Sequence, residues 1–262
     1  MEPTDRVNPY EAPRAELDVA PALGLKANLA DAVAGRYTFT VGEVMDEAWR
    51  LVKGMKGTFW AAAIVVGLIY LLFDTVCEMV FAAAISKTPN MIVKQLFKGV
   101  IGALMTPVTM GIQMMCVRRA LGAPISFGTA FSYFSRSGTA LAAALLVMLL
   151  TDLGLVLLVI PGIYLALAYS MTTQLICDQG LTAWQAMEVS RRAITHRWWS
   201  VLGLGLVIGL LTVVSALGLL IPLIWTIPWA MMASGVLYRR IFYAAQAPLA
   251  DGPPVVAPLP PG

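Results

Sequence analysis

The dominant feature of this sequence is a series of apolar stretches long enough to cross a lipid bilayer. A helix that crosses the hydrocarbon core needs about 20 largely apolar residues. Six stretches meet this requirement, at residues 57–84, 99–117, 138–160, 162–177, 200–219 and 223–242. The sequence therefore predicts an all-α, polytopic membrane protein with six transmembrane helices.

The composition argues against a soluble fold. Of the 262 residues 59% are hydrophobic and only 13% are charged, and the mean hydropathy is +0.77. An ordinary soluble domain carries roughly 25% charged residues. A compact soluble fold of this length has too little polar surface to cover so much apolar material. A soluble enzyme, a nucleic-acid-binding domain and a disordered chain are therefore poor interpretations.

Prolines indicate how the six stretches are connected. Pro161 and Gly162 predict a tight turn between the third and fourth spans, and Pro222 predicts one between the fifth and sixth. Pro107 and Pro228 fall inside spans and are expected to kink them, which neighbouring helices tolerate. The spans would then form three hairpins, and no discontinuous helix is expected.

A short amphipathic helix is predicted before each hairpin. These segments have a helical period but are too polar to cross a membrane, and they cover residues 41–53, 127–135 and 183–195. Capping residues precede them, namely Thr40 with Glu43, Ser126, and Thr182 with Gln185. We expect such helices to lie in the membrane interface, with their apolar faces about 5–10 Å into the headgroup boundary.

The two ends of the chain differ from its centre in amino-acid composition. Residues 1–36 mix Pro, Ala and both signs of charge and predict a disordered cytoplasmic tail. Residues 37–243 form the predicted membrane domain, and residues 244–262 a Pro-rich cytoplasmic tail. No cleavable signal peptide is expected, because the first apolar run begins only near Phe59.

Basic residues set the expected orientation. With the N-terminus inside, fifteen Lys and Arg lie on the inner side, and only Lys87, Lys94 and Lys98 lie outside. The positive-inside rule then places both termini in the cytoplasm of a multi-pass protein of the inner membrane. The basic segment 191–197 adjoins Trp198 at a membrane entry, so we expect it to contact anionic headgroups of the inner leaflet rather than nucleic acid.

Motifs for catalysis, metals and cofactors are missing from the sequence. His196 is the single histidine, which excludes HExxH and a Ser/His/Asp set, and no phosphate-binding loop occurs. Asp74 and Glu78 lie four residues apart but are expected at the wetted outer interface. The cysteines have no metal-ligand spacing and stand at Cys77, Cys116 and Cys177. We expect no enzyme activity, no cofactor and no metal.

One ionisable residue lies deep inside a predicted span. Asp152 is about 14 residues from the inner end of the third span, or roughly 21 Å at the helical rise. Burying such a group costs about 2.5–3.5 kcal/mol, which makes it a candidate functional residue. Counting back from the Pro161 turn puts Tyr169 and Ser170 at its depth, so we expect a hydrogen bond to one of them. The cluster either holds neighbouring helices together by hydrogen bonds, which is the interpretation that the sequence favours, or it is a proton or substrate site.

A family resemblance rests on one stretch of the chain, which covers under a quarter of it. Its motifs are Asp152, Ile160-Pro161-Gly162-Ile163, Cys177-Asp178, Ser190-Arg191-Arg192 and Trp198-Trp199. The pattern resembles the YciC-like inner-membrane proteins of Gram-negative bacteria. It is also similar to the membrane domain fused to some bacterial glycerophosphodiester phosphodiesterases. The resemblance implies a polytopic inner-membrane protein and brings no catalytic residues, since the phosphodiesterase domain has no counterpart here.

Two functions follow as expectations from these features. The first is a non-enzymatic integral membrane protein that serves as an envelope-associated or assembly scaffold of undefined biochemistry. The alternative is a small permease or channel with a polar site around Asp152. A water-filled cavity that reaches Asp152 would favour transport, whereas a dry, filled bundle would favour the scaffold.

Overall fold

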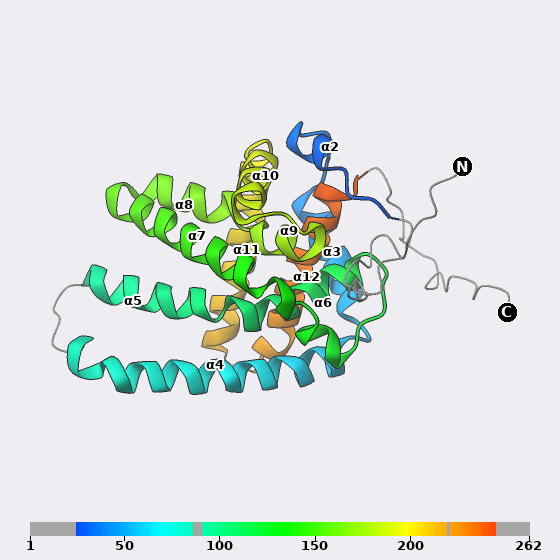
Figure 1. The fold of residues 1–262 in the computed structure, drawn as a ribbon. Coiled ribbons are helices and arrows are strands. Elements are labelled where there is room, and N and C mark those ends of the chain that lie inside the picture. The colour runs from blue at the N-terminus through cyan, green and yellow to red at the C-terminus, as the bar shows by residue number, and fades with distance from the viewer. Residues whose placement is uncertain (1–24, 86–90, 219–220, 245–262) are drawn as a thin grey trace, which may run out of the picture.

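The computed structural model describes residues 25–85, 91–218 and 221–244, which form helices and no strand (Figure 1). The α-helices are α2 (Leu29–Val33), α3 (Val41–Val52), α4 (Lys56–Ile85), α5 (Met91–Leu104), α6 (Thr106–Ala120), α7 (Ser137–Leu157), α8 (Val159–Ala168), α9 (Thr172–Gln179), α10 (Ala183–Thr195), α11 (Trp198–Leu217) and α12 (Leu223–Phe242). Two short 3₁₀ helices precede α7, namely η1 (Phe127–Phe131) and η2 (Phe134–Arg136). The predicted all-α class is confirmed for this part of the chain.

Several helices are long and apolar enough to cross a membrane. Four segments qualify, at Lys56–Val80, Phe127–Leu157, Val159–Gln179 and Trp198–Leu217, and the bent pair α5–α6 gives a fifth if it counts as one span. Their outer faces expose large apolar side chains, such as Leu72 (67%) and Leu217 (81%), which water would penalise. These helices are consistent with an integral membrane protein.

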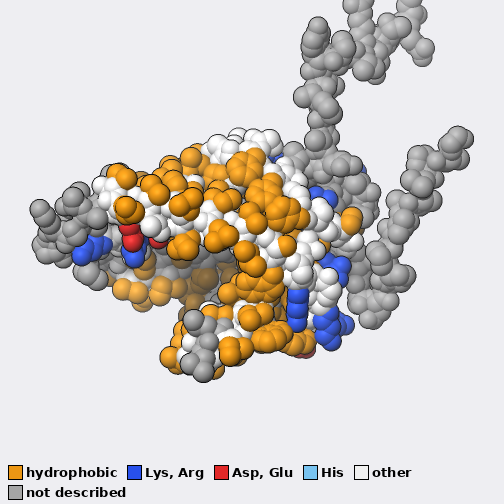
Figure 2. Space-filling model, turned by 90° about the horizontal axis from the view of Figure 1, so that it is seen from below, with side chains coloured by type: hydrophobic (Ala, Val, Ile, Leu, Met, Phe, Trp, Pro, Cys, Tyr) orange, Lys and Arg blue, Asp and Glu red, His pale blue; other side chains and the backbone are white. Residues whose placement is uncertain are grey.

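The surface separates apolar from charged regions. Figure 2 shows apolar side chains spread over the body of one face, which is hollowed between two lobes. Lys and Arg side chains gather at one end of that face, and a smaller charged group lies at the other end. In Figure 1, α4, α5, α7 and α8 run side by side across the picture.

Helix α12 packs largely in the protein core, and the expected sixth span is not confirmed. It packs against α3 and α6, and its buried side chains include Met232, Val236 and Tyr238. It does not qualify as a candidate span, because Arg239 and Arg240 lower its hydropathy. Its apolar residues from Trp229 onward are mostly buried, whereas Ile224, Trp225 and Ile227 in its first turns are exposed.

The second expected span is broken instead of continuous. Helices α5 and α6 meet at Met105 at an angle of 61°. Pro107 does not kink a helix from within but lies in the first turn of α6, where a missing N–H loses no helical hydrogen bond. The kink expected near Pro107 is therefore present as a sharp break two residues earlier, at Met105.

The turn between the third and fourth spans comes three residues earlier than predicted. Leu158 is extended (φ −158°, ψ 131°) and separates α7 from α8, so Pro161 and Gly162 lie in the first turn of α8. Gly162 is required there, because a Cβ would lie 2.6 Å from the backbone nitrogen of Leu155. Residues 169–171 then form a turn between α8 and α9. The predicted fourth span, over residues 162–177, lies within the candidate span Val159–Gln179, which this short turn interrupts.

Two of the three predicted short helices form at the expected places. α3 begins with the Thr40/Glu43 capping box and α10 with the Thr182/Gln185 box. The middle segment forms η1 and η2 instead of one helix. Its serines and Gly128 disfavour a regular helix, and the Ser132 hydroxyl donates to the Gly128 carbonyl (2.9 Å).

The predicted N-terminal tail is shorter than expected. Within residues 25–36 the chain forms α2, capped by Asn28, whose side chain accepts from the Asp31 amide (3.0 Å). The Asn28 backbone N–H donates to the carbonyl of Phe242 at the end of α12 (2.8 Å). The His196 ring lies against Gly35, and its Nε2 bonds the Val33 carbonyl (2.9 Å). Residues 1–24 and 245–262 lie outside the described residues.

Ion pairs form on the polar faces of two short helices, between α3 and α12 and within α10. The Thr40 backbone N–H and the Arg240 guanidinium hold the pKa of the Glu43 carboxyl below its ordinary value near 4.5. Arg192 and Arg191 do the same for the pKa of Glu188 on α10. Both carboxylates therefore stay ionised at neutral pH, and their contribution to stability is present above that ordinary value and lost as the pH falls below it.

Candidate functional site

A cavity of about 380 Å³ lies where the two broken helices meet α7. Its walls come from the end of α5 and start of α6, from the middle of α7, and from the turn between α8 and α9. Small residues form much of the wall and leave the space open: Gly99, Gly102, Ala103, Ala143, Ala144 and Ala166. Their size is what allows α5 and α7 to approach each other around an unfilled volume.

Polar groups line the same cavity at the level of the breaks. Asp152 is 9% exposed and is the carboxylate of the site. The hydroxyls of Thr151 and Thr172 are buried there without a hydrogen-bond partner. Tyr169 and Thr173 complete the polar wall. Buried hydroxyls without partners are rare in folded proteins, so the hydroxyls of Thr151 and Thr172 leave hydrogen-bonding capacity unused at the cavity wall.

Gly99 allows the carboxylate of Asp152 to approach α5. A Cβ at Gly99 would lie 3.1 Å from Oδ2 of Asp152 and 3.0 Å from the side chain of Met148. Both contacts are tighter than ordinary van der Waals packing. The glycine therefore fixes the distance between the α5 backbone and the acid.

Two helix N-termini begin at the cavity. α6 starts at Thr106 and α9 at Thr172, and neither N-cap residue, Met105 or Met171, makes a side-chain capping hydrogen bond. Helix N-termini carry a partial positive charge that favours a nearby anion. Within the described residues Asp152 forms no ion pair with a cationic side chain. Two helix N-termini thus lie at the cavity, and Asp152 has no cationic partner among the described residues.

The predicted cluster is only partly assembled. Asp152 and Tyr169 both line the cavity, whereas Ser170 is exposed and does not. The expected hydrogen bond from Tyr169 or Ser170 to Asp152 is not among the contacts that the described residues form. Thr151 and Thr172 were not predicted, because hydroxyl residues in apolar helices usually bond their own backbone and give no distinct pattern.

A second buried carboxylate is structural. Asp178 at the end of α9 accepts hydrogen bonds from the hydroxyls of Tyr238 (2.7 Å) and Tyr243 (2.7 Å) and from the amide of Gln179 (2.6 Å). All three hydrogen bonds reach Oδ2, and those from the tyrosines join α9 to α12 and the residue after it. Asp178 differs in this from Asp152, whose cavity is open.

Other chemistry-bearing residues are dispersed. Among the described residues no three His, Cys, Asp or Glu side chains come close enough to hold a metal ion. The cysteines are free thiols, with Cys116 and Cys177 buried and Cys77 partly exposed. The cavity around Asp152 is the strongest candidate site in this part of the structure.

Comparison with family models, with curated proteins and with solved structures finds no match to this chain. The resemblance to the YciC-like proteins therefore stays a prediction. The candidate site rests on geometry and chemistry alone.

Proposed function

We propose that this protein is a small permease for a cationic solute and that the cavity around Asp152 is its binding site. The observation that carries the proposal is an open cavity that reaches a buried carboxylate beside the broken pair α5–α6 and the turn between α8 and α9. Discontinuous helices around a polar site at depth are typical of transporters. Ionisable groups at such depth commonly mark a substrate or ion pathway.

The chemistry of the wall indicates the kind of solute. A carboxylate without a cationic partner gains most from a positively charged occupant, which neutralises it in a medium of low dielectric constant. The free hydroxyls of Thr151 and Thr172 add hydrogen-bond acceptors for an ammonium-type group. The volume of about 380 Å³ lies at the lower end of the range for small-molecule sites. We therefore infer a small organic cation.

The scaffold interpretation expects a filled bundle, and the cavity argues against it for α5 to α9. We place the protein in the inner membrane as a multi-pass protein with cytoplasmic termini, on the strength of its basic residues. Its short helices, such as α3 and α10, would then rest at the inner interface, near anionic headgroups.

Thiol labelling tests whether water and ions reach the cavity. In a chain whose three cysteines are replaced by Ala, Ala144→Cys places a thiol at the cavity and Leu149→Cys places one on the apolar outer face of α7. We expect a cationic methanethiosulfonate to modify the first thiol about tenfold faster than its anionic counterpart, because Asp152 attracts cations. Adding Asp152→Asn should remove that preference. The Leu149→Cys thiol should stay unmodified, and equal protection of both thiols would contradict an aqueous cavity.

Uptake into proteoliposomes tests the function itself. Radiolabelled methylammonium, guanidinium and choline serve as probes, and we expect the wild-type protein to admit at least one of them. Asp152→Asn should lower that uptake by about tenfold or more, because the charge that binds the cation is lost. Asp74→Asn is the matched control, since it removes a carboxylate of α4 outside the cavity. Uptake that is absent for all probes, or unchanged in Asp152→Asn, would contradict the proposal.

A further inference from the structure

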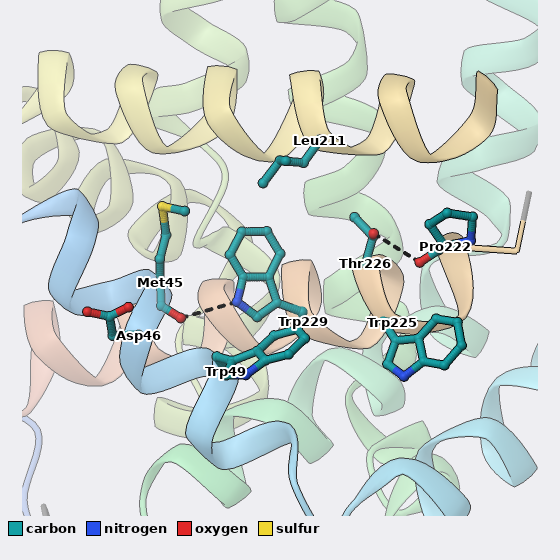
Figure 3. A pocket seen from close by; sticks show the side chains of 8 residues that line it. All are labelled: Met45, Asp46, Trp49, Leu211, Pro222, Trp225, Thr226 and Trp229. Carbon is teal, nitrogen blue, oxygen red and sulfur yellow. Dashed lines mark hydrogen bonds between the residues drawn. The ribbon is translucent and has the colours of Figure 1, made fainter. Parts of the chain in front are cut away.

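A second open volume of about 380 Å³ is an aromatic groove between α3, α11 and α12 (Figure 3). Trp49 comes from α3, and Trp225 and Trp229 come from α12. Leu211 of α11 faces them across the groove, and Trp49 and Trp229 lie next to each other. The groove shares no lining residue with the cavity around Asp152.

Two polar side chains of α12 in this groove, Trp229 and Thr226, already have hydrogen-bond partners. The indole N–H of Trp229 donates to the Met45 carbonyl (3.1 Å). The Thr226 hydroxyl lies 2.8 Å from that of Ser215 and 3.1 Å from the Pro222 carbonyl. An occupant therefore meets a largely apolar wall, and recognition falls to the charged groups beside it.

Two opposite charges flank the groove. Asp46 of α3 lines it, is exposed, and forms no ion pair within the described residues. The ammonium of Lys56 lies 6.0 Å from the ring centre of Trp225, another lining residue. The groove thus offers an anion, a cation and the exposed indole rings of Trp49 and Trp225, whose faces attract ammonium groups.

We propose that this groove binds a zwitterionic phospholipid with an ammonium headgroup. The ammonium would pair with Asp46 and the indole faces, and the phosphate with Lys56. The acyl chains would lie along α11, whose outer face exposes Leu210 (66%) and Val214 (56%) beside the groove. An anionic lipid that has no ammonium group would pair with Lys56, but Asp46 would repel its negative charge. Charge complementarity therefore selects the zwitterionic lipid. This site is independent of the proposed transport function.

Native mass spectrometry of the full chain in mild detergent tests this assignment. Delipidated protein is incubated with equal amounts of phosphatidylethanolamine and phosphatidylglycerol, and retained lipid is counted. We expect phosphatidylethanolamine to be retained about fivefold more, which is a modest selectivity on the affinity scale. Asp46→Asn and Lys56→Gln should each remove the preference. Asp74→Asn and Lys53→Gln, which change like charges outside the groove, should keep it.

A variant that fills the groove distinguishes a bound lipid from a soluble headgroup and from a second copy of the chain. Leu211→Trp places a large side chain in the groove and should reduce phosphatidylethanolamine retention with no change in helicity by circular dichroism. Equal retention of the two lipids by the wild-type protein would overturn the proposal. Displacement of the lipid by soluble phosphoethanolamine would also overturn it, because the ligand would then be a soluble headgroup. So would a concentration-dependent dimer that Leu211→Trp abolishes, since a second copy would then occupy the groove.

Discussion

Gly111→Ala is expected to abolish the folded protein. Gly111 lies on α6 against the backbone of η1, and a Cβ there would lie 1.7 Å from the Ala130 carbonyl oxygen and 2.4 Å from its carbon. Ala130 is 1% exposed, and η1 also packs against α4, so the clash cannot be relieved by moving a flexible side chain. The loss should exceed about 4 kcal/mol, which is exceptional for a single substitution. Size-exclusion chromatography and thermal melting in detergent measure it.

Gly67→Ala is the matched control for this experiment. Gly67 lies within α4, and nothing lies within 4 Å of where its Cβ would be. Alanine also has a higher helix propensity than glycine, so this variant should melt at or above the wild-type temperature. A Gly111→Ala protein that is monodisperse and melts within a few degrees of the wild type would show that η1 is not seated on α6.

Glu47→Gln is expected to lower the free energy of unfolding by about 3–5 kcal/mol, because it leaves a buried cation uncompensated. Glu47 of α3 is 8% exposed and accepts hydrogen bonds from Arg239 and from Nε of Arg240 (3.0 Å) on α12. Arg239 also donates to the Ala120 carbonyl at the end of α6 (3.2 Å). The pair therefore joins three helices at one point. Denaturation in mixed micelles, followed by circular dichroism, gives the difference.

Two further variants define the origin of that loss. Glu43→Gln removes the neighbouring carboxylate, which pairs with Arg240 (2.6 Å) from an exposed position, and should cost far less. The double variant Glu47→Leu with Arg239→Met should recover most of the stability, because apolar pairs often replace buried ion pairs without loss. If Glu47→Gln and Glu43→Gln are equally stable, the buried pair does not hold α3 to α12.

Local signals made much of the helical architecture predictable. The capping boxes at Thr40 and Thr182 fix the first turns of α3 and α10 through hydrogen bonds within four residues. Apolar length likewise predicted α4, α7 and α11. Hydropathy does not distinguish a side chain that faces lipid from one that faces protein, and the extensive burial of α12 was not predicted for that reason. Its Trp229 and Met232 serve the core.

The turn between α8 and α9 lacked a local signal, whereas Pro107 lies just after the break between α5 and α6. Residues 169–171 contain neither Pro nor Gly, and Met105 precedes a proline by two positions. Their geometry follows from packing among α5, α7 and α10, which a single sequence does not display. Asp152 was predicted because its burial is costly, whereas Tyr169 was placed by counting from a turn that lies at Leu158. The cavity itself follows from small residues that meet only after folding.

The hydrogen bond between Asn28 and Phe242 restricts the topology of the whole chain. Two residues that touch lie on the same side of any bilayer, so the segment between them crosses an even number of times. Five complete crossings are then forbidden by parity. Either the bent pair α5–α6 enters the lipid and returns to the side it left, or α12 supplies a sixth passage despite its buried surface.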